Sequence, residues 1–264
     1  MVKVVFFDID GTLFSTSANR VPEDACEAVA ALRARGIRVV IATGRHPIEL
    51  DGAHLEGMAF DGYAAANGQM CLDGARQLFA GCPIPAQGTH ALTGLYERKE
   101  MLLWFFSETE SFTNFADEGL FAMAEDVRGV RPAVRPYEGE TLYQAVAFVS
   151  EDDEPALAAL LPGCSLQRWG TEGVDIIAES GGKVDGMKAF LSRFGCMPEE
   201  CMAFGDQRND LDMLRFAGIG VAMGNATPAV KQAADYVTAS VDSGGVVRAL
   251  EHFGVLERGW RTLA

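Results

Sequence analysis

Two aspartates, Asp8 and Asp10, come directly after the apolar run from Val4 to Phe7, and Gly11 and Thr12 follow them. A short run of β-branched and aromatic residues is typical of a buried strand in a parallel sheet, and such sheets bind ligands beyond the carboxyl ends of their strands. Two carboxylates this close repel each other unless a cation or a shared proton relieves the repulsion. The spacing therefore predicts cation-assisted chemistry, with a polar turn held by local hydrogen bonds as the simpler alternative.

A second cluster, Thr43, Gly44 and Arg45, follows a strand predicted at Ile37 to Ala42. Its hydroxyl and backbone N–H groups could hold an anionic oxygen, but Thr43 could equally cap a helix and Arg45 could be a solvated charge. A third candidate, Lys183, follows two glycines, and a lone lysine is usually solvated. Each of these two features is weak alone.

The fourth cluster is the segment 205–210, Gly-Asp-Gln-Arg-Asn-Asp, which follows a strand predicted at Cys201 to Phe204. Acidic groups are favoured at the start of a helix, so Asp206 and Asp210 could simply cap the next one. Asp206, Asn209 and Asp210 together exceed what capping needs, and we interpret the segment as functional. All four clusters are predicted at the edge where a parallel sheet gathers its ligands.

The chain has 264 residues, with 22 Lys and Arg against 37 Asp and Glu and a formal charge of −15. Such a negative field disfavours binding to nucleic acid and to anionic lipid, so an anionic substrate would need a local cation. No apolar run approaches the ~18 residues of a membrane span, and the early acids exclude a signal peptide, so we expect a cytoplasmic protein. The six cysteines show no metal-binding or paired spacing and are expected to be reduced.

Hydrophobic periodicity predicts alternating strands and helices, which is typical of a parallel sheet with right-handed crossovers. The predicted elements are a helix over Pro22 to Arg35, a weaker helix over Pro47 to Leu55, a strand over Tyr63 to Ala66, a hairpin over Gln69 to Phe79, and helices over Val184 to Phe194 and after residue 210.

The pattern changes after the segment Cys82-Pro83-Ile84-Pro85 and returns at Gly181-Gly182. We predict a core of residues 1–83 and 183–264 and an inserted α+β cap of residues 84–182, joined by two hinges. The cap is predicted to contain strands at Met101 to Phe106 and Tyr143 to Val149, and a helix at Pro155 to Leu161. Arg128, Arg131 and Arg135 could line a substrate pocket there, although such a run is usually a solvated face.

In order, Asp8-Ile9-Asp10-Gly11-Thr12, Thr43-Gly44-Arg45, Lys183 and the segment 205–210 resemble the four signature motifs of the haloacid dehalogenase-like hydrolases. The segments Ala66-Asn67-Gly68 and Met223-Gly224-Asn225-Ala226 extend the likeness, and the position of the insertion is similar to that in the Cof-type phosphatase branch. Gln207 stands where many relatives have glycine. The resemblance implies an α/β fold: a Rossmann-like, doubly wound parallel sheet core with an inserted α+β cap domain.

The resemblance also implies roles for these residues. Asp8 would be the nucleophile that forms an aspartyl-phosphate, and Asp10 would protonate the leaving alkoxide and then activate water. Mg²⁺ would be held by Asp8, the backbone carbonyl of Asp10 and Asp206, with Asp210 helping to position the site. The phosphoryl group would lie among Gly11, Thr43, Gly44, Lys183 and Asn209.

The expected function is a Mg²⁺-dependent phosphatase for small phosphorylated metabolites, with sugar phosphates as the expected substrates and no nucleic-acid or membrane partner. Two alternatives stay open: a phosphomutase on the same scaffold, and a non-catalytic sugar-phosphate sensor. The presence of every acid and the lysine argues against the sensor. The sequence names neither the physiological substrate nor the oligomeric state.

Overall fold

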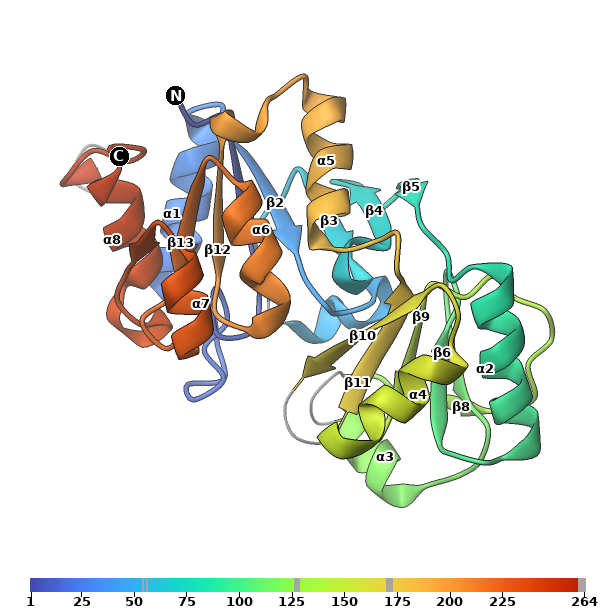
Figure 1. Ribbon diagram of the computed structural model, residues 1–264. Coiled ribbons are helices and arrows are strands. Elements are labelled where there is room, and N and C mark those ends of the chain that lie inside the picture. The colour runs from blue at the N-terminus through green and yellow to red at the C-terminus, as the bar shows by residue number, and fades with distance from the viewer. Residues whose placement is uncertain (54, 56, 126–128, 170–172, 261–264) are drawn as a thin grey trace.

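The computed structural model describes residues 1–53, 55, 57–125, 129–169 and 173–260. Its strands form two sheets, one of eight strands in the order β14-β13-β12-β1-β2-β3-β4-β5 and one of six in the order β10-β11-β9-β6-β7-β8 (Figure 1). Every strand of the smaller sheet lies in the sequence between β5 and helix α5, so the chain leaves the larger sheet once and returns to complete it.

The larger sheet has β1 at its centre, between β12 and β2. Its parallel strands are β1 (Val4–Phe7), β2 (Arg38–Ala42), β3 (Gly62–Ala65), β12 (Cys201–Gly205), β13 (Ile219–Ala222) and β14 (Tyr236–Val237), and an antiparallel hairpin of β4 (Met70–Asp73) and β5 (Leu78–Gly81) extends one edge. In register, Phe7 lies between Phe204 and Ile41, so β1, β2 and β12 end at the same edge of the sheet. The predicted fold class and hairpin are confirmed.

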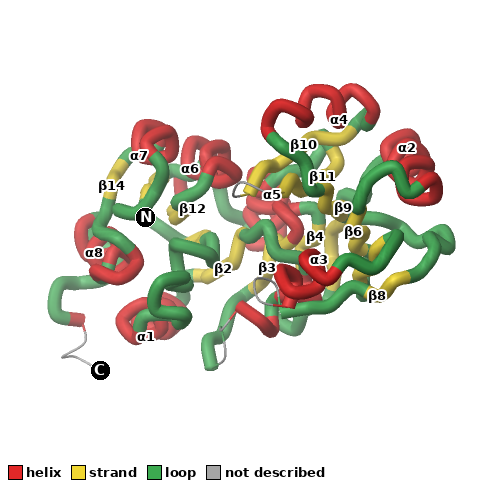
Figure 2. The backbone as a smooth tube through the Cα atoms, turned by 90° about the horizontal axis from the view of Figure 1, so that it is seen from below, coloured by secondary structure: helices red, strands yellow, loops and turns green. Residues whose placement is uncertain are grey.

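Helices cover both faces of this sheet (Figure 2). They bury its apolar side chains in two clusters, one on each face. Helices α1 (Glu23–Ala34) and α8 (Gly245–His252) pack on one face, around Leu32 and Leu250. Helices α5 (Lys183–Phe194), α6 (Leu211–Phe216) and α7 (Pro228–Ala233) pack on the other, around Phe190 and Leu214. Because helices cover both faces of the sheet, a ligand is expected to bind at the ends of its strands. The polar residues that follow the strands lie at their C-terminal ends.

The smaller sheet contains β6 (Leu103–Phe106), β7 (Ser111–Thr113), β8 (Ala133–Val134), β9 (Gln144–Ala147), β10 (Cys164–Trp169) and β11 (Gly173–Ala178). Helices α2 (Ala86–Arg98) and α4 (Glu154–Leu160) pack on one face with Phe105 and Ile176, and α3 (Glu118–Met123) lies near the opposite face. Because side chains alternate along a strand, Phe106, Gln144 and Asp175 share that opposite face, which turns toward the core. The cap borders, residues 84 and 182, stay a prediction.

The segment 47–55 differs from its prediction as a helix. Among its described residues it forms two single 3-10 turns, Pro47–Glu49 and Asp51–Ala53. The Glu49 carboxylate accepts a hydrogen bond from the backbone N–H of His46 at 2.6 Å, which caps the start of the first turn, and Gly52 disfavours its continuation as a regular helix.

Two arginines of the run predicted in the cap, Arg131 and Arg135, contact nearby acids and aromatic rings. Arg131 pairs with Glu125, and Arg135 pairs with Glu110 and Glu140. Arg128 lies outside the described residues. All six cysteines are free thiols. In the described part of the chain, none of the helices is both long and apolar enough to cross a membrane.

Candidate active site

Three buried carboxylates meet beyond the ends of β1 and β12. Asp8, Asp206 and Asp210 each offer an oxygen, and these oxygens lie within 4.8 Å of one another. Asp8 and Asp206 are brought together because their strands pair in parallel at the centre of the sheet. Asp210 returns through a 3-10 turn, and its Oδ2 accepts the backbone N–H groups of Asp206 and Gln207, each at 2.9 Å. The turn at 208–210, which the sequence alone could explain as a helix N-cap, therefore also brings a third carboxylate to the cluster.

Lys183 is the cation of this cluster. Its Nζ donates to Asp8 Oδ1 at 2.7 Å and to Asp210 Oδ1 at 2.6 Å, and its side chain is 2% exposed. The backbone before it passes so close to Gly68, which has φ +85°, that a side chain on Gly68 would overlap the Gly182 carbonyl. Glycine at 68 thus lets the start of α5 approach the sheet edge and aim Lys183 between the two acids.

The electrostatics of the cluster favour a bound cation. Burial raises the pKa of Asp8 well above its ordinary value, the neighbouring acids add to this, and Lys183 offsets only part of it. Burial and Asp210 raise the pKa of Asp206 to about 6. Burial alone would lower the pKa of Lys183, but the carboxylates of Asp210 and Asp8 outweigh it, so that pKa is raised and the ammonium stays charged.

Three buried carboxylates against one lysine leave an excess of negative charge on oxygen donors. Hard divalent cations such as Mg²⁺ prefer this donor set, and the residues present fit one. Thr12 donates to Asp206 Oδ1 at 3.0 Å and fixes the orientation of that carboxylate. A Cβ at Gly11 would overlap the Asp206 carboxylate, and Gly11 has φ +85°, so only glycine fits there.

Asp10 lies apart from the three clustered carboxylates. Its oxygens accept two hydrogen bonds from the Arg45 guanidinium, at 2.7 and 2.8 Å, in a bidentate pair. Arg45 is in turn positioned by Thr43, whose Oγ1 accepts the Arg45 backbone N–H at 3.1 Å. The side chain of Asp10 is thus held outside the three-carboxylate cluster, and its role in catalysis and that of its carbonyl as a metal ligand stay predictions. The sequence allowed Arg45 to be a solvated charge. In the structure Arg45 is instead buried and pairs with Asp10.

The cap places two polar side chains over the phosphate-binding candidates. Asp175 Oδ2 accepts from Asn67 Nδ2 at 2.9 Å, and Asn67 Oδ1 accepts from Asn209 Nδ2 at 3.0 Å. Gln144 Nε2 donates to the Gly44 carbonyl at 3.2 Å. A chain of amides therefore joins the cap to the edge of the core sheet. Sequence reasoning missed Asp175 and Gln144, and the available signal was a single acid inside the apolar run 173–178.

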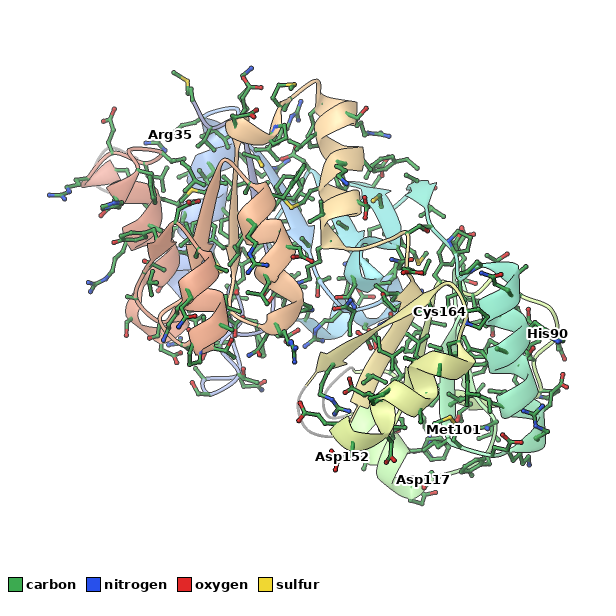
Figure 3. All side chains as sticks on the ribbon, in the orientation of Figure 1. Arg35, His90, Met101, Asp117, Asp152 and Cys164 are labelled. Atoms are coloured by element: carbon green, nitrogen blue, oxygen red, sulfur yellow. The ribbon has the colours of Figure 1, made fainter. Side chains whose placement is uncertain are left out.

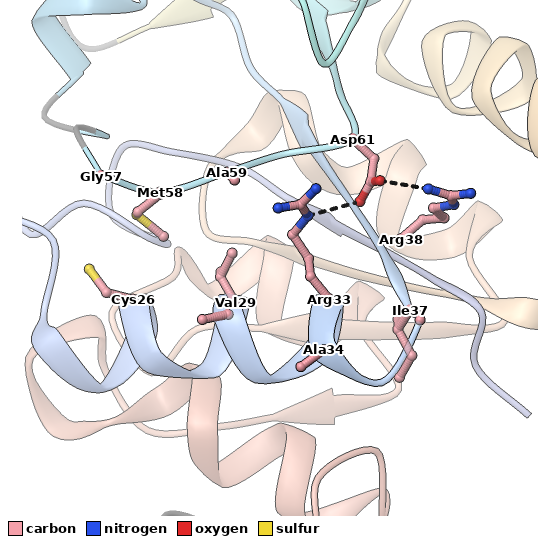
Figure 4. Close-up of a pocket in the computed structure, with 12 residues that line it drawn as sticks. Cys26, Val29, Arg33, Ala34, Ile37, Arg38, Gly57, Met58, Ala59 and Asp61 are labelled. Carbon is pink, nitrogen blue, oxygen red and sulfur yellow. Dashed lines mark hydrogen bonds and ion pairs between the residues drawn. The ribbon is translucent and has the colours of Figure 1, made fainter. Parts of the chain in front are cut away.

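Two other features of the molecule lie away from this edge. A cavity of about 700 Å³ lies between α1 and the segment 57–61, and its arginines Arg33 and Arg38 are both bound by Asp61 (Figure 4). This cavity lies where β2 begins, at the end of the strands opposite to Asp8 and Asp206. His90 lies on the outer side of the cap, remote from the core (Figure 3).

The haloacid dehalogenase-like hydrolase family matches residues 5–250, in agreement with the carboxylate cluster and the cap. The chain belongs to this family. It is similar to BT1666 from Bacteroides thetaiotaomicron, a phosphatase of the superfamily, with 32% identity, 97% and 96% of the two chains covered and a TM-score of 0.87. It is also similar to BT4131, described as a subclass IIB sugar phosphatase, with 34% identity, 97% and 100% coverage and a TM-score of 0.85.

A relative from another organism agrees. YkrA of Bacillus subtilis (strain 168) is 32% identical over 260 residues, which cover 97% of this chain and 99% of YkrA. These likenesses support the Cof-type branch of the family and a phosphomonoesterase activity. This haloacid dehalogenase-like hydrolase is therefore a phosphatase, while the roles of its individual site residues stay predictions.

The pKa of Asp206 gives a test of the cluster that needs no substrate. An unfolded aspartate titrates near pH 3.9, whereas the pKa of Asp206 in the folded protein is about 6. Between these values the folded protein binds more protons than the unfolded chain, so stability falls as pH rises. In EDTA, we expect Asp206→Asn to melt above wild type, with the gap widening from about pH 4 to pH 6, by roughly 2–4 °C per kcal/mol relieved.

Two measurements complete this test. Mg²⁺ should raise the melting temperature of wild type at pH 7 and act much less on Asp206→Asn, which has lost a ligand. Asp212→Asn, at a side chain that is 83% exposed on the same segment, is the matched control and should change neither curve. If Asp206 were only a cap, its loss would instead lower the melting temperature at every pH and Mg²⁺ would make no difference.

Proposed function

We propose that this phosphatase hydrolyses phosphate esters of small metabolites, sugar phosphates above all, with Mg²⁺ and through an aspartyl-phosphate on Asp8. One observation carries the proposal: a buried carboxylate, Asp8, is oriented by a lysine inside a cluster of three acids, while another carboxylate, Asp10, is held outside that cluster by Arg45. Nucleophile and proton carrier need these different surroundings. The proposed setting is the cytoplasm, where such esters occur.

The residues divide the reaction into two steps. An Asp8 carboxylate oxygen forms a bond to phosphorus as the ester oxygen leaves, and Asp10 gives that oxygen its proton. Water then attacks the phosphorus of the aspartyl-phosphate, Asp10 takes its proton, and the Asp8 carboxylate is restored. Lys183, held at 2.7 Å from Asp8, stands where it neutralises charge on the transferring group. Mg²⁺ bound by Asp8 and Asp206 would keep these acids ionised and offset the charge of the phosphoryl group.

The polar side chains of the cap favour a substrate whose leaving group carries hydroxyls. Asp175 is 3% exposed yet accepts a hydrogen bond from the core amide Asn67, so the cap brings an acceptor close to the phosphate-binding groups. Gln144 adds a second polar side chain on the same face of the cap sheet. Sugar hydroxyls can exchange hydrogen bonds with such groups, and the relative BT4131 is described as a sugar phosphatase.

The direct test is phosphate release from a panel of sugar, nucleotide and cofactor monophosphates in Mg²⁺ and in EDTA. We expect Mg²⁺-dependent release, with the highest kcat/KM among sugar phosphates. The same reactions are also analysed for a glycosyl bisphosphate. Its formation would indicate a phosphomutase and not a phosphatase. Release that is equal in EDTA, or a preference for nucleotides, would contradict the proposal.

Removal of the cap acid should change selectivity more than chemistry. Asp175→Ala is expected to lower kcat/KM for the best sugar phosphate by about tenfold or more, since a hydrogen bond to a charged group contributes about 1.5–3 kcal/mol. Hydrolysis of p-nitrophenyl phosphate, which has no hydroxyls to bind, should fall less. Asp152→Asn, on the outer surface of the cap (Figure 3), is the control. Equal losses on both substrates would assign Asp175 a structural role.

A further inference from the structure

A cavity of about 270 Å³ lies between core and cap, next to the phosphate-binding candidates. Lys183 and Asn209 line it, together with Arg208 from the turn that carries Asn209, and Gln167 from cap strand β10. Gln167 pairs in register with Asp175 on β11, and side chains of such a pair project from the same face about 5 Å apart. The cavity therefore begins at the amides that join Asp175 to Asn209 and extends sideways under the cap.

Arg208 differs from the other cations at this edge of the sheet. Lys183 is bound to Asp8 and Asp210, and Arg45 to Asp10. In the described part of the chain, Arg208 forms no ion pair, and its side chain is exposed toward the cavity that it lines. The charge of Arg208 is thus still available to a ligand.

Two acids of the same cavity are paired with cations other than Arg208. Asp185 is paired with Lys188 at 2.9 Å, and Asp212 lies 3.6 Å from Arg215. Glu179 also lines the cavity and is the one cavity acid, among described residues, with no such pair. In a chain of charge −15, an unpaired guanidinium beside an acidic site is the feature that would attract a second anion.

We propose that Arg208, with Gln167, binds a second anionic group on the leaving group of the substrate, either a carboxylate or a second phosphate. The inference rests on the proposed function and narrows its substrate class to sugar-acid phosphates and sugar bisphosphates. A guanidinium binds either group through two parallel N–H donors, and a glutamine amide can add a third. The anion replaces water around Arg208 and needs no change in the residues that carry out the chemistry.

The test compares three substrates with the same protein: 6-phosphogluconate for the carboxylate, fructose 1,6-bisphosphate for the second phosphate, and glucose 6-phosphate as the neutral case. We expect wild type to favour one of the first two by about tenfold or more in kcat/KM, which corresponds to about 1.4 kcal/mol. Arg208→Gln should remove most of that preference, mainly through KM. Arg193→Gln, on α5 with a 44% exposed side chain and outside the cavity lining, should keep it.

Dissociation constants measured by calorimetry on the Asp8→Asn protein give a second readout that does not depend on turnover. Arg208→Gln in that background should weaken binding of the anion-bearing ligand about tenfold more than binding of glucose 6-phosphate. No preference in wild type, or a preference that survives Arg208→Gln in both assays, would overturn the inference. Continued hydrolysis of p-nitrophenyl phosphate in Mg²⁺ would show that the proposed function stands even so.

Glu179 supplies the control for a different role of Arg208. If Arg208 acted as a latch that pairs with Glu179 when the cap closes, Glu179→Gln and Arg208→Gln would lower kcat/KM equally for all three substrates, and the inference would be wrong. If Arg208 binds the anion, Glu179→Gln removes a competing negative charge and keeps or increases the preference.

Discussion

Asp8→Asn is expected to remove phosphatase turnover, by on the order of 10⁴-fold or more in kcat, because an amide cannot attack phosphorus. The fold should persist, since Asn keeps the shape of the side chain and can still accept the hydrogen bond from Lys183. The variant also removes the buried negative charge, whose unfavourable desolvation raises the pKa of Asp8, so its melting temperature in EDTA should not fall.

The measurement is steady-state phosphate release from the purified variant, with sugar phosphate and with p-nitrophenyl phosphate. Asp51→Asn is the control, because that carboxylate is 84% exposed and pairs with Arg76 at the surface. Activity of Asp8→Asn near that of Asp51→Asn would rule out Asp8 as the nucleophile. A loss confined to one substrate would point to a binding role instead.

Lys183→Ala is expected to have the second largest effect, a fall in kcat of about 10²-fold or more, because a preorganised charge beside the transferring group is lost. It should also destabilise the protein in EDTA. Without Lys183, Asp8 and Asp210 remain buried with no ammonium between them, and removing one partner of a buried ion pair costs about 3–5 kcal/mol.

The two consequences can be separated with Mg²⁺. The metal should restore part of the melting temperature of Lys183→Ala, because it offsets the same negative charge, but it should not restore turnover. Lys188→Ala, one turn along α5 with a 56% exposed side chain, is the control for both readouts. A Lys183→Ala protein with the stability and kcat of Lys188→Ala would mean that Lys183 is a bystander.

The sequence predicts the core of this site because parallel strands converge. Asp8 and Asp206 each follow a short apolar run, and two such strands paired side by side must bring the next residues to one edge. The sequence evidence that Lys183 is functional is weak when that residue is taken alone. It becomes specific only together with the other three motifs. Its bridge between Asp8 and Asp210 depends on the close approach of α5 to Gly68, which no local pattern reveals.

The contacts that were missed join segments far apart in the sequence. Gln144 reaches Gly44 across 100 residues and Asp175 reaches Asn67 across 108, so both depend on how the cap meets the core. Periodicity describes one element at a time and carries no information on that meeting. The error at 47–55 is of a local kind, since Gly52 disfavours the helix that the apolar spacing predicted and the segment forms two short turns instead.

The central claim is that the phosphoryl group passes through Asp8. The most direct measurement is rapid quenching during turnover with a sugar phosphate and Mg²⁺, followed by borohydride reduction and mass spectrometry of the peptide that contains Asp8 and Asp10. An acyl phosphate is reduced to an alcohol, so we predict homoserine at position 8 in wild type, unmodified aspartate at position 10, and no reduction when Mg²⁺ is replaced by EDTA. Reduction at position 10 or at another acid, or no reduced residue in protein quenched during rapid turnover, would contradict the account.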